Sequence, residues 1–121
     1  MNLNSVADVR VVGLGACTSV GRDAWSTAAA IRAGVSGFAD HPYMVDTAGE
    51  RMRVALAPWL DTDFGGVDRF EALLLPALDQ ALAPVSVLRD VGIRVALALA
   101  LPALRPGLPD DLDRRLRAAI S

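Results

Sequence analysis

The sequence of 121 residues contains no lysine, so all 12 of its basic residues are arginines. A chain without lysine cannot form a Schiff base, anchor pyridoxal phosphate or supply the lysine of a P-loop. Cysteine and histidine occur once each, as Cys17 and His41. These numbers exclude an internal disulfide and a zinc site with the usual three or four Cys or His ligands. We therefore predict no metal and no cofactor.

Long hydrophobic runs and an excess of charge are also missing. The 12 basic residues nearly balance 14 acidic ones, for a net charge of -2, which predicts no attraction to nucleic acid or to an anionic membrane. The longest apolar run, Val95 to Leu104, is interrupted by Pro102 and is about half of what spans a bilayer. Residues 1–10 lack the pattern of a secretory signal. We expect a cytoplasmic protein that binds neither nucleic acid nor membrane.

The residues that are present are typical of a globular chain. Hydrophobic residues make up 53% and charged residues 21% of the sequence, which is enough apolar material for a core. The length suits one domain, so we treat residues 1–121 as a single domain. The preference for Asp over Glu, with 12 against 2, and the abundance of Ala (21) and Leu (17) suggest the coding bias of a GC-rich bacterial genome.

The first half of the chain alternates between strand and helix signals. Val9–Gly15 is β-branched and ends in glycines, which predicts a strand that runs into a tight loop. Asp23 can cap a helix that continues to Ala33. Residues 43–45 and 51–56 alternate around a turn that contains Gly49, which predicts a β-hairpin.

The second half contains the clearest helical periodicity. Apolar residues from Phe70 to Leu82 recur at three and four residues, although Pro76 lies inside this helix and should kink it. Ile93–Leu101 has no polar residue after Arg94, which is typical of a strand covered on both faces. Asp110 or Asp111 can cap a last helix with Leu112, Leu116 and Ile120 on one side. Strands that alternate with helices predict an α/β fold.

Gly13-Leu14-Gly15, between a predicted strand and a helix, is similar to the start of a dinucleotide-binding loop. That motif requires a third glycine at position 18, where this chain has Thr18. No second strand with an acidic end follows at the usual distance. We therefore favour a structural turn over a nucleotide site.

Cys17 would need a base to act as a nucleophile, and His41 is the only histidine available. A helix N-terminus can lower a thiol pKa, but nothing in the sequence brings His41 close to Cys17. We favour a structural thiol for Cys17 and a loop position for His41, which precedes Pro42. Neither is predicted to be catalytic.

The remaining charged residues occur in connections and on a helix. We interpret the acidic ones as caps and turn formers rather than as metal ligands or acid/base groups: Asp61, Asp63, Asp110, Asp111 and Asp113. The arginines near the C-terminal end are interpreted as a solvated helix face rather than as a phosphate or lipid site: Arg114, Arg115 and Arg117. We predict no catalytic, cofactor-binding or metal-binding residue in this chain.

Two segments carry a resemblance to a known family. They are Val11-Val12-Gly13-Leu14-Gly15-Ala16-Cys17-Thr18-Ser19-Val20-Gly21, followed by Trp25, and Ile31-Arg32-Ala33-Gly34-Val35-Ser36-Gly37-Phe38. This pattern resembles the N-terminal segment of β-ketoacyl synthases, the thiolase-fold condensing enzymes. Asp68-Arg69-Phe70 and the helix to Leu82 are similar to the next helix of that family, and Ile93–Leu101 falls where its following strand is expected.

The resemblance implies the N-terminal part of a thiolase-like layered α/β/α fold with a mixed sheet. The complete enzyme would carry out a decarboxylating Claisen condensation, in fatty acid or polyketide synthesis, between an acyl thioester on Cys and malonyl on acyl carrier protein. Ser19 replaces the usual proline, and Leu101-Pro102 replaces a glycine-rich strand end. The family's nucleophilic Cys and its catalytic His residues lie in motifs that this chain does not contain.

These observations leave two hypotheses open. In the first, residues 1–121 are an incomplete β-ketoacyl synthase-like domain, an acyltransferase segment whose activity depends on a missing C-terminal half. In the second, the chain is a non-catalytic thiolase-like interaction or adaptor protein. His41-Pro42-Tyr43-Met44-Val45-Asp46 looks similar to divergent thiolase-like proteins linked to type VI secretion. Either hypothesis predicts exposed apolar surface, and therefore a homo-oligomer or pairing with the missing half.

Overall fold

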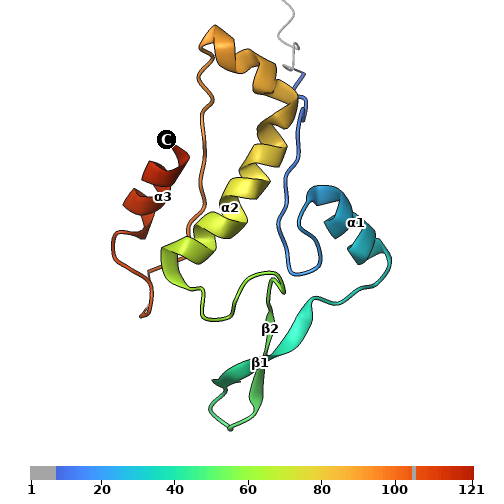
Figure 1. Cartoon of the computed structure of the whole chain (residues 1–121), viewed down its shortest axis with the longest axis vertical. Helices are drawn as coiled ribbons and strands as arrows, with labels where there is room; N and C mark the ends of the chain where they lie inside the picture. The colour runs from blue at the N-terminus through green and yellow to red at the C-terminus, as the bar shows by residue number, and fades with distance from the viewer. Residues whose placement is uncertain (1–7, 105) are drawn as a thin grey trace, which may run out of the picture.

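A computed structural model describes residues 8–104 and 106–121. Residues 1–7, where no secretory signal is expected, and Arg105 lie outside the described residues. The described chain mixes helices with one two-stranded antiparallel sheet, so the α/β expectation is confirmed at that level. Figure 1 shows a long central helix with extended segments on both sides of it and a hairpin at one end.

Helix α1 (Ala24–Arg32) begins where the sequence predicts it. The side chain of Asp23 accepts a hydrogen bond from the backbone N–H of Ser26, while the Ser26 hydroxyl accepts one from the N–H of Asp23. This reciprocal pair is a capping box, which satisfies two N–H groups that the helix itself cannot bond. Gly34 follows the helix with a φ of 73°, a conformation that favours glycine.

The predicted hairpin is confirmed and is longer than expected. Strand β1 (Phe38–Val45) pairs with β2 (Arg51–Ala55), and the register shifts between Asp40 and Val45. Pro42 lies in that irregular stretch, where the ladder can tolerate a residue without an N–H. Asp46 closes the turn, because its Oδ1 accepts hydrogen bonds from the N–H groups of Ala48 and Glu50.

Helix α2 (Gly66–Leu82) confirms the predicted periodic helix and runs through Pro76. It continues into a 3-10 helix, η1 (Ala83–Val91), that the sequence analysis did not predict. Helix α3 (Leu112–Ile120) has Asp111 at its N-cap position, but the Asp111 side chain makes no capping hydrogen bond and pairs with Arg114 instead.

A small apolar core joins α2 to α3. Val67, Leu112 and Leu116 are buried together, and Leu116 is only 1% exposed. Partly buried side chains that pack around them come from α2 and the connections: Phe70, Leu99, Leu101 and Leu108. The core thus lies at the start of α2, and it leaves much of the helix uncovered.

Two predicted strands are absent from the described chain. Residues 9–15 and 93–101 are extended but belong to no sheet. Val11 is 78% exposed and Val95 65%, so the prediction that the second segment is covered on both faces was wrong as well. An apolar run becomes a strand only when another strand pairs with its backbone, and the described residues supply none.

Candidate functional site

The glycines of the Gly13-Leu14-Gly15 motif bring the chain into direct contact with α2. A Cβ atom on Gly13 would overlap the carbonyl oxygen of Ala81, and one on Gly15 would overlap the carbonyl oxygen of Ala77. Only glycine permits this close approach of one backbone to another. The motif therefore fixes a segment against a helix.

Gln80 of α2 holds the loop that follows these glycines. Its side-chain Oε1 accepts hydrogen bonds from the backbone N–H groups of Ala16 and Ala24, both at 3.2 Å. Its Nε2 donates to the carbonyl oxygen of Arg22 at 3.0 Å. One side chain thus joins α2, the glycine loop and the start of α1.

These contacts bear directly on the nucleotide hypothesis. A dinucleotide loop leaves the N–H groups at the start of its helix free for the pyrophosphate. Here the N–H of Ala24 is bonded to Gln80, and the N–H of Ser26 is bonded to the Asp23 carboxylate. A carboxylate at this position would also repel an anion, so the structural interpretation of the glycines is favoured.

Cys17 and His41 lie in different elements, and no hydrogen bond joins them among the described residues. Cys17 is partly buried in the loop before α1. His41 is only 6% exposed and lies in β1, so its prediction as a loop residue was wrong. Its Nδ1 accepts hydrogen bonds from the N–H groups of Met44 at 3.0 Å and Tyr43 at 3.4 Å. His41 therefore shapes the irregular stretch of the hairpin.

The acidic residues considered above act locally. Asp61 Oδ1 accepts a hydrogen bond from the N–H of Asp63, which forms a turn before α2. Asp111 pairs with Arg114 at 2.8 Å, and this hydrogen bond lowers the pKa of the Asp111 carboxyl. In the described part of the chain, no three residues of the Asp, Glu, His and Cys types are grouped as metal ligands would be.

The arginines of α3 face solvent, as expected. Arg114 pairs with Asp111, and Arg117 lies 4.0 Å from the carboxylate of Asp113 one turn earlier. Exposed pairs of this kind contribute little to stability. The two pairs partly neutralise the basic face, which weakens the case for a phosphate site there.

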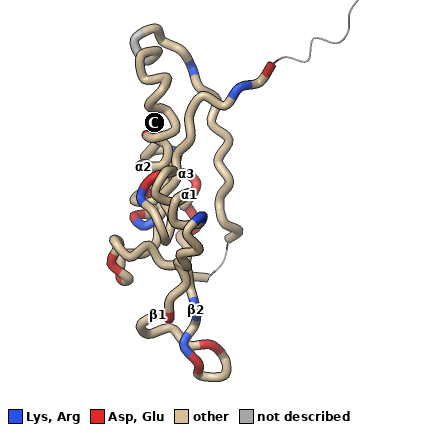
Figure 2. Tube along the Cα trace, turned by 90° about the vertical axis from the view of Figure 1, so that its right-hand side faces the viewer, with Lys and Arg blue, Asp and Glu red and all other residues tan. Residues whose placement is uncertain are grey.

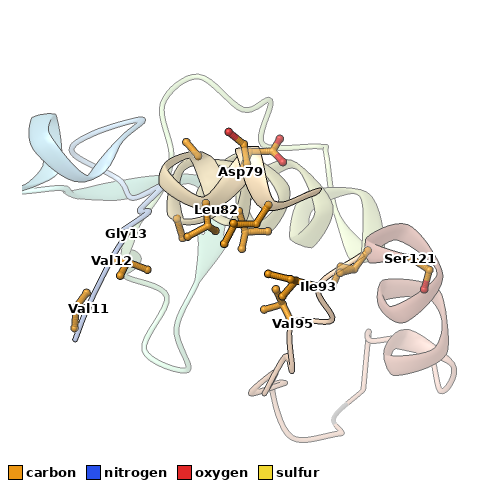
Figure 3. A pocket seen from close by; sticks show the side chains of 14 residues that line it. Val11, Val12, Gly13, Asp79, Leu82, Ile93, Val95 and Ser121 are labelled. Atoms are coloured by element: carbon orange, nitrogen blue, oxygen red, sulfur yellow. The ribbon is translucent and has the colours of Figure 1, made fainter. Parts of the chain in front are cut away.

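An apolar groove with a volume of about 870 Å³ lies beside α2. In Figure 3, Val11 and Val12 lie on one side of it and Ile93 and Val95 on the other, with Leu82 of α2 between them. The complete lining is Val11, Val12, Gly13, Asp79, Ala81, Leu82, Ala83, Val85, Ser86, Leu88, Ile93, Val95, Ile120 and Ser121. We call this surface the α2 groove.

The α2 groove suits an apolar partner rather than reaction chemistry. Asp79 is its only charged lining side chain, and no His or Cys lines it. Figure 2 shows that charged residues gather on the helices and the hairpin, whereas the extended segments are uncharged except near their upper ends. No motif in the sequence predicts this groove, although two apolar segments with an apolar helix between them are visible there.

One helical stretch, Gly66–Leu88, is long and apolar enough to cross a membrane, with a mean hydropathy of 1.3. Length and composition alone are weak evidence, because helices of soluble proteins often meet the same test. The expectation of a cytoplasmic protein that does not bind membranes stays a prediction.

Comparisons with protein-family models, with curated proteins and with solved structures find no match to this chain.

Proposed function

We propose that this chain is the N-terminal part of a thiolase-fold condensing enzyme of the β-ketoacyl synthase type, with a structural and not a catalytic role. The observation that carries the proposal is the arrangement of residues 9–15 and 93–101 around α2. Both segments run in the same direction, opposite to that of α2, and lie along this one helix (Figure 1). Two parallel segments joined through a helix are the pattern of an α/β layer.

The dimensions of these parts agree with such a layer. A helix of 17 residues such as α2 is about 25 Å long, and a seven-residue strand such as 9–15 extends about 23 Å. The glycine contacts on Ala77 and Ala81 hold the first segment close to the helix axis. Under this proposal, both segments become strands of a larger sheet when the rest of the fold covers them.

The proposed structural role also agrees with the surroundings of Cys17 and His41, which form no catalytic pair. In this family the acyl thioester forms on a Cys in a downstream motif, and acyl carrier protein delivers the malonyl group. Cys17 has no base within hydrogen-bonding distance among the described residues, and His41 Nδ1 is occupied by backbone N–H groups. This chain would therefore support the condensation only by holding the sheet that carries the catalytic half.

A second candidate, a non-catalytic thiolase-like adaptor, is favoured by the hairpin. The hairpin projects from the end of the molecule in Figure 1, and its apolar residues Phe38, Tyr43 and Val45 are exposed. Exposed apolar side chains on a projecting element are available for contact with another protein. Association with type VI secretion belongs to this candidate.

The two candidates are separated by an activity assay on the natural protein. An acyl thioester and malonyl carried by acyl carrier protein are supplied, and formation of the β-ketoacyl product is measured. We expect condensation that the Cys17→Ser variant leaves unchanged. Acylation of Cys17 that the same substitution abolishes would contradict the structural role, and the absence of any condensation would favour the adaptor.

A further inference from the structure

His41 of β1 is a titratable side chain that the fold buries, with only 6% of its surface exposed. Its Nδ1 lies 3.0 Å from the backbone nitrogen of Met44 and 3.4 Å from that of Tyr43. Both of these backbone groups are donors, so Nδ1 is an acceptor and carries no proton. The closed hairpin therefore requires the neutral imidazole with its proton on Nε2.

Protonation of the ring turns this acceptor into a donor. A histidine cation carries a proton on both nitrogens, so Nδ1–H would point at two N–H groups that then have no acceptor. Buried N–H groups without a partner are unfavourable. Histidine is the side chain whose charge ordinarily changes between about pH 5 and 8, so mild acid is the condition that tests this arrangement.

The elements around the histidine carry charged side chains of both signs: Asp40 on β1, Arg51 and Arg53 on β2, and Asp61, Asp63 and Arg69 at the loop before α2. Among the described residues, none of them makes a hydrogen bond or an ion pair with the imidazole. The two backbone donors are therefore what Nδ1 meets, and protonation of the ring removes both of their hydrogen bonds.

Tyr43 connects this part of the hairpin to the loop before α2. Its ring packs edge-on against the imidazole, with ring centroids 4.5 Å apart and planes at 88°. Its hydroxyl lies 3.3 Å from the carbonyl oxygen of Thr62 and 3.4 Å from Oδ1 of Asp63, either of which can accept its hydrogen bond. A movement of the backbone at Tyr43 would therefore disturb this loop as well.

We propose that His41 is a pH-sensitive switch of the hairpin. In the neutral form, Nδ1 holds the backbone of residues 43–44, and Tyr43 joins the hairpin to the loop before α2. When Nδ1 takes up a proton from solvent, the irregular stretch of β1 opens and the contact of Tyr43 with residues 62–63 is lost. The open form binds one more proton than the closed form, so acid raises the ratio of open to closed hairpin by up to about tenfold per pH unit. The proposal does not depend on the family assigned above.

The first test follows the imidazole and the Met44 amide of the full chain by NMR between about pH 8 and 5. Nitrogen-15 shifts of the ring should change from the Nε2–H tautomer to the cation. The protection factor of the Met44 amide against hydrogen exchange should fall with the same midpoint, by up to about tenfold per pH unit. The amide of Ala48, which bonds to Asp46 Oδ1 instead, is the internal control and should keep its protection. A ring that protonates while Met44 stays protected, or a ring that stays neutral throughout, would overturn the proposal.

His41→Asn is the matched variant for this test. Asparagine accepts hydrogen bonds from backbone N–H groups just ahead of it in turns, so its oxygen can replace Nδ1, and it does not titrate. Met44 should then stay protected over the whole pH range. His41→Phe has no acceptor and should leave Met44 unprotected at every pH. Loss of protection in the Asn variant at the same pH as in the native chain, or full protection in the Phe variant, would contradict a switch at this residue.

Tyr43→Phe separates the switch from the loop that it contacts. The ring stays against the imidazole but the hydroxyl is gone, so Met44 should still respond to acid. The Asp63 amide, whose NMR signal should move with the histidine in the native chain, should no longer do so in this variant. A movement of the Asp63 signal that persists would contradict the connection through Tyr43.

Discussion

The side-chain oxygen of Gln80 lies 3.2 Å from the backbone nitrogen of Ala16 and accepts its hydrogen bond, which ties the middle of α2 to a loop 64 residues earlier. The same oxygen accepts from the N–H of Ala24, so one side chain fixes both the glycine loop and the start of α1. These bonds place residues 9–15 along α2. The α2 groove and the proposed role as part of a condensing enzyme depend on that placement.

Replacing Gln80 should therefore loosen the N-terminal third of the chain. Gln80→Leu removes three hydrogen bonds and leaves two N–H groups without a partner, at a cost of about 1–3 kcal/mol in the free energy of unfolding. Gln80→Glu keeps the acceptor oxygens and should cost less. Urea denaturation followed by circular dichroism measures both variants. Equal losses for the two would show that the acceptor has no special role.

Substitution at Gly15 tests the close approach of the loop to the helix. Gly15→Ala puts a methyl group into the carbonyl oxygen of Ala77, and overpacking of this kind costs about 1–3 kcal/mol. The adjacent Leu14 is mostly exposed, so Leu14→Ala is a matched control that should change stability by no more than about 0.5 kcal/mol. If Gly15→Ala proved as mild as the control in chemical denaturation, the segment would not lie against α2 in solution.

The core between α2 and α3 predicts a large effect at Leu116. Leu116→Ala empties the most deeply buried position and should cost about 2–5 kcal/mol, a large part of the stability of a chain with so small a core. Leu104→Ala, at a residue that is 75% exposed, serves as the control. Thermal unfolding and amide exchange in α3 measure the difference. Comparable melting temperatures for the two variants would mean that α3 does not dock as described.

The cap of α1 predicts a dependence on acid pH. The hydrogen bond from the backbone N–H of Ser26 lowers the pKa of the Asp23 carboxyl, so the charged cap stabilises the native state fully above the unfolded pKa. This contribution is lost as the pH falls below about 4 and through the lowered native value. The amide shift of Ser26, followed by NMR, should titrate below the range of an ordinary aspartate.

Asp23→Asn is the control for this titration. Asparagine caps helices about as well as aspartate but carries no charge, so the acid transition at Ser26 should disappear while α1 stays formed. An acid transition that persisted in this variant would assign it to another carboxyl group.

Local signals in the sequence were sufficient for α1, α2 and the hairpin, whereas the 3-10 helix η1 was not predicted. Asp23, the periodicity from Phe70 to Leu82 and the turn at Gly49 act within a few residues, so α1, α2 and the hairpin could be predicted. Residues 9–15 and 93–101 could not be placed correctly. Their patterns indicate strands, but a strand depends on a partner that the described chain does not supply.

The candidate site was harder to predict for a related reason. The α2 groove joins Val11, Leu82 and Val95, which are far apart in the sequence and carry no motif. The glycines that drew attention to a nucleotide loop instead reflect contacts with Ala77 and Ala81, which only the packing of α2 reveals. The structural role of His41 was likewise hard to predict. Its Nδ1 bonds to backbone N–H groups in the irregular part of β1, and the neighbouring Pro42 indicates that irregularity only in part.

The most direct test of the proposed function is intact mass spectrometry of the natural protein from its source, with peptide sequencing of any part beyond Ser121. The account predicts a mass well above 12.7 kDa and a downstream segment that contains a nucleophilic Cys motif and catalytic His residues. A natural protein of 12.7 kDa, or a longer one without those residues, would contradict a condensing enzyme and direct attention to the adaptor.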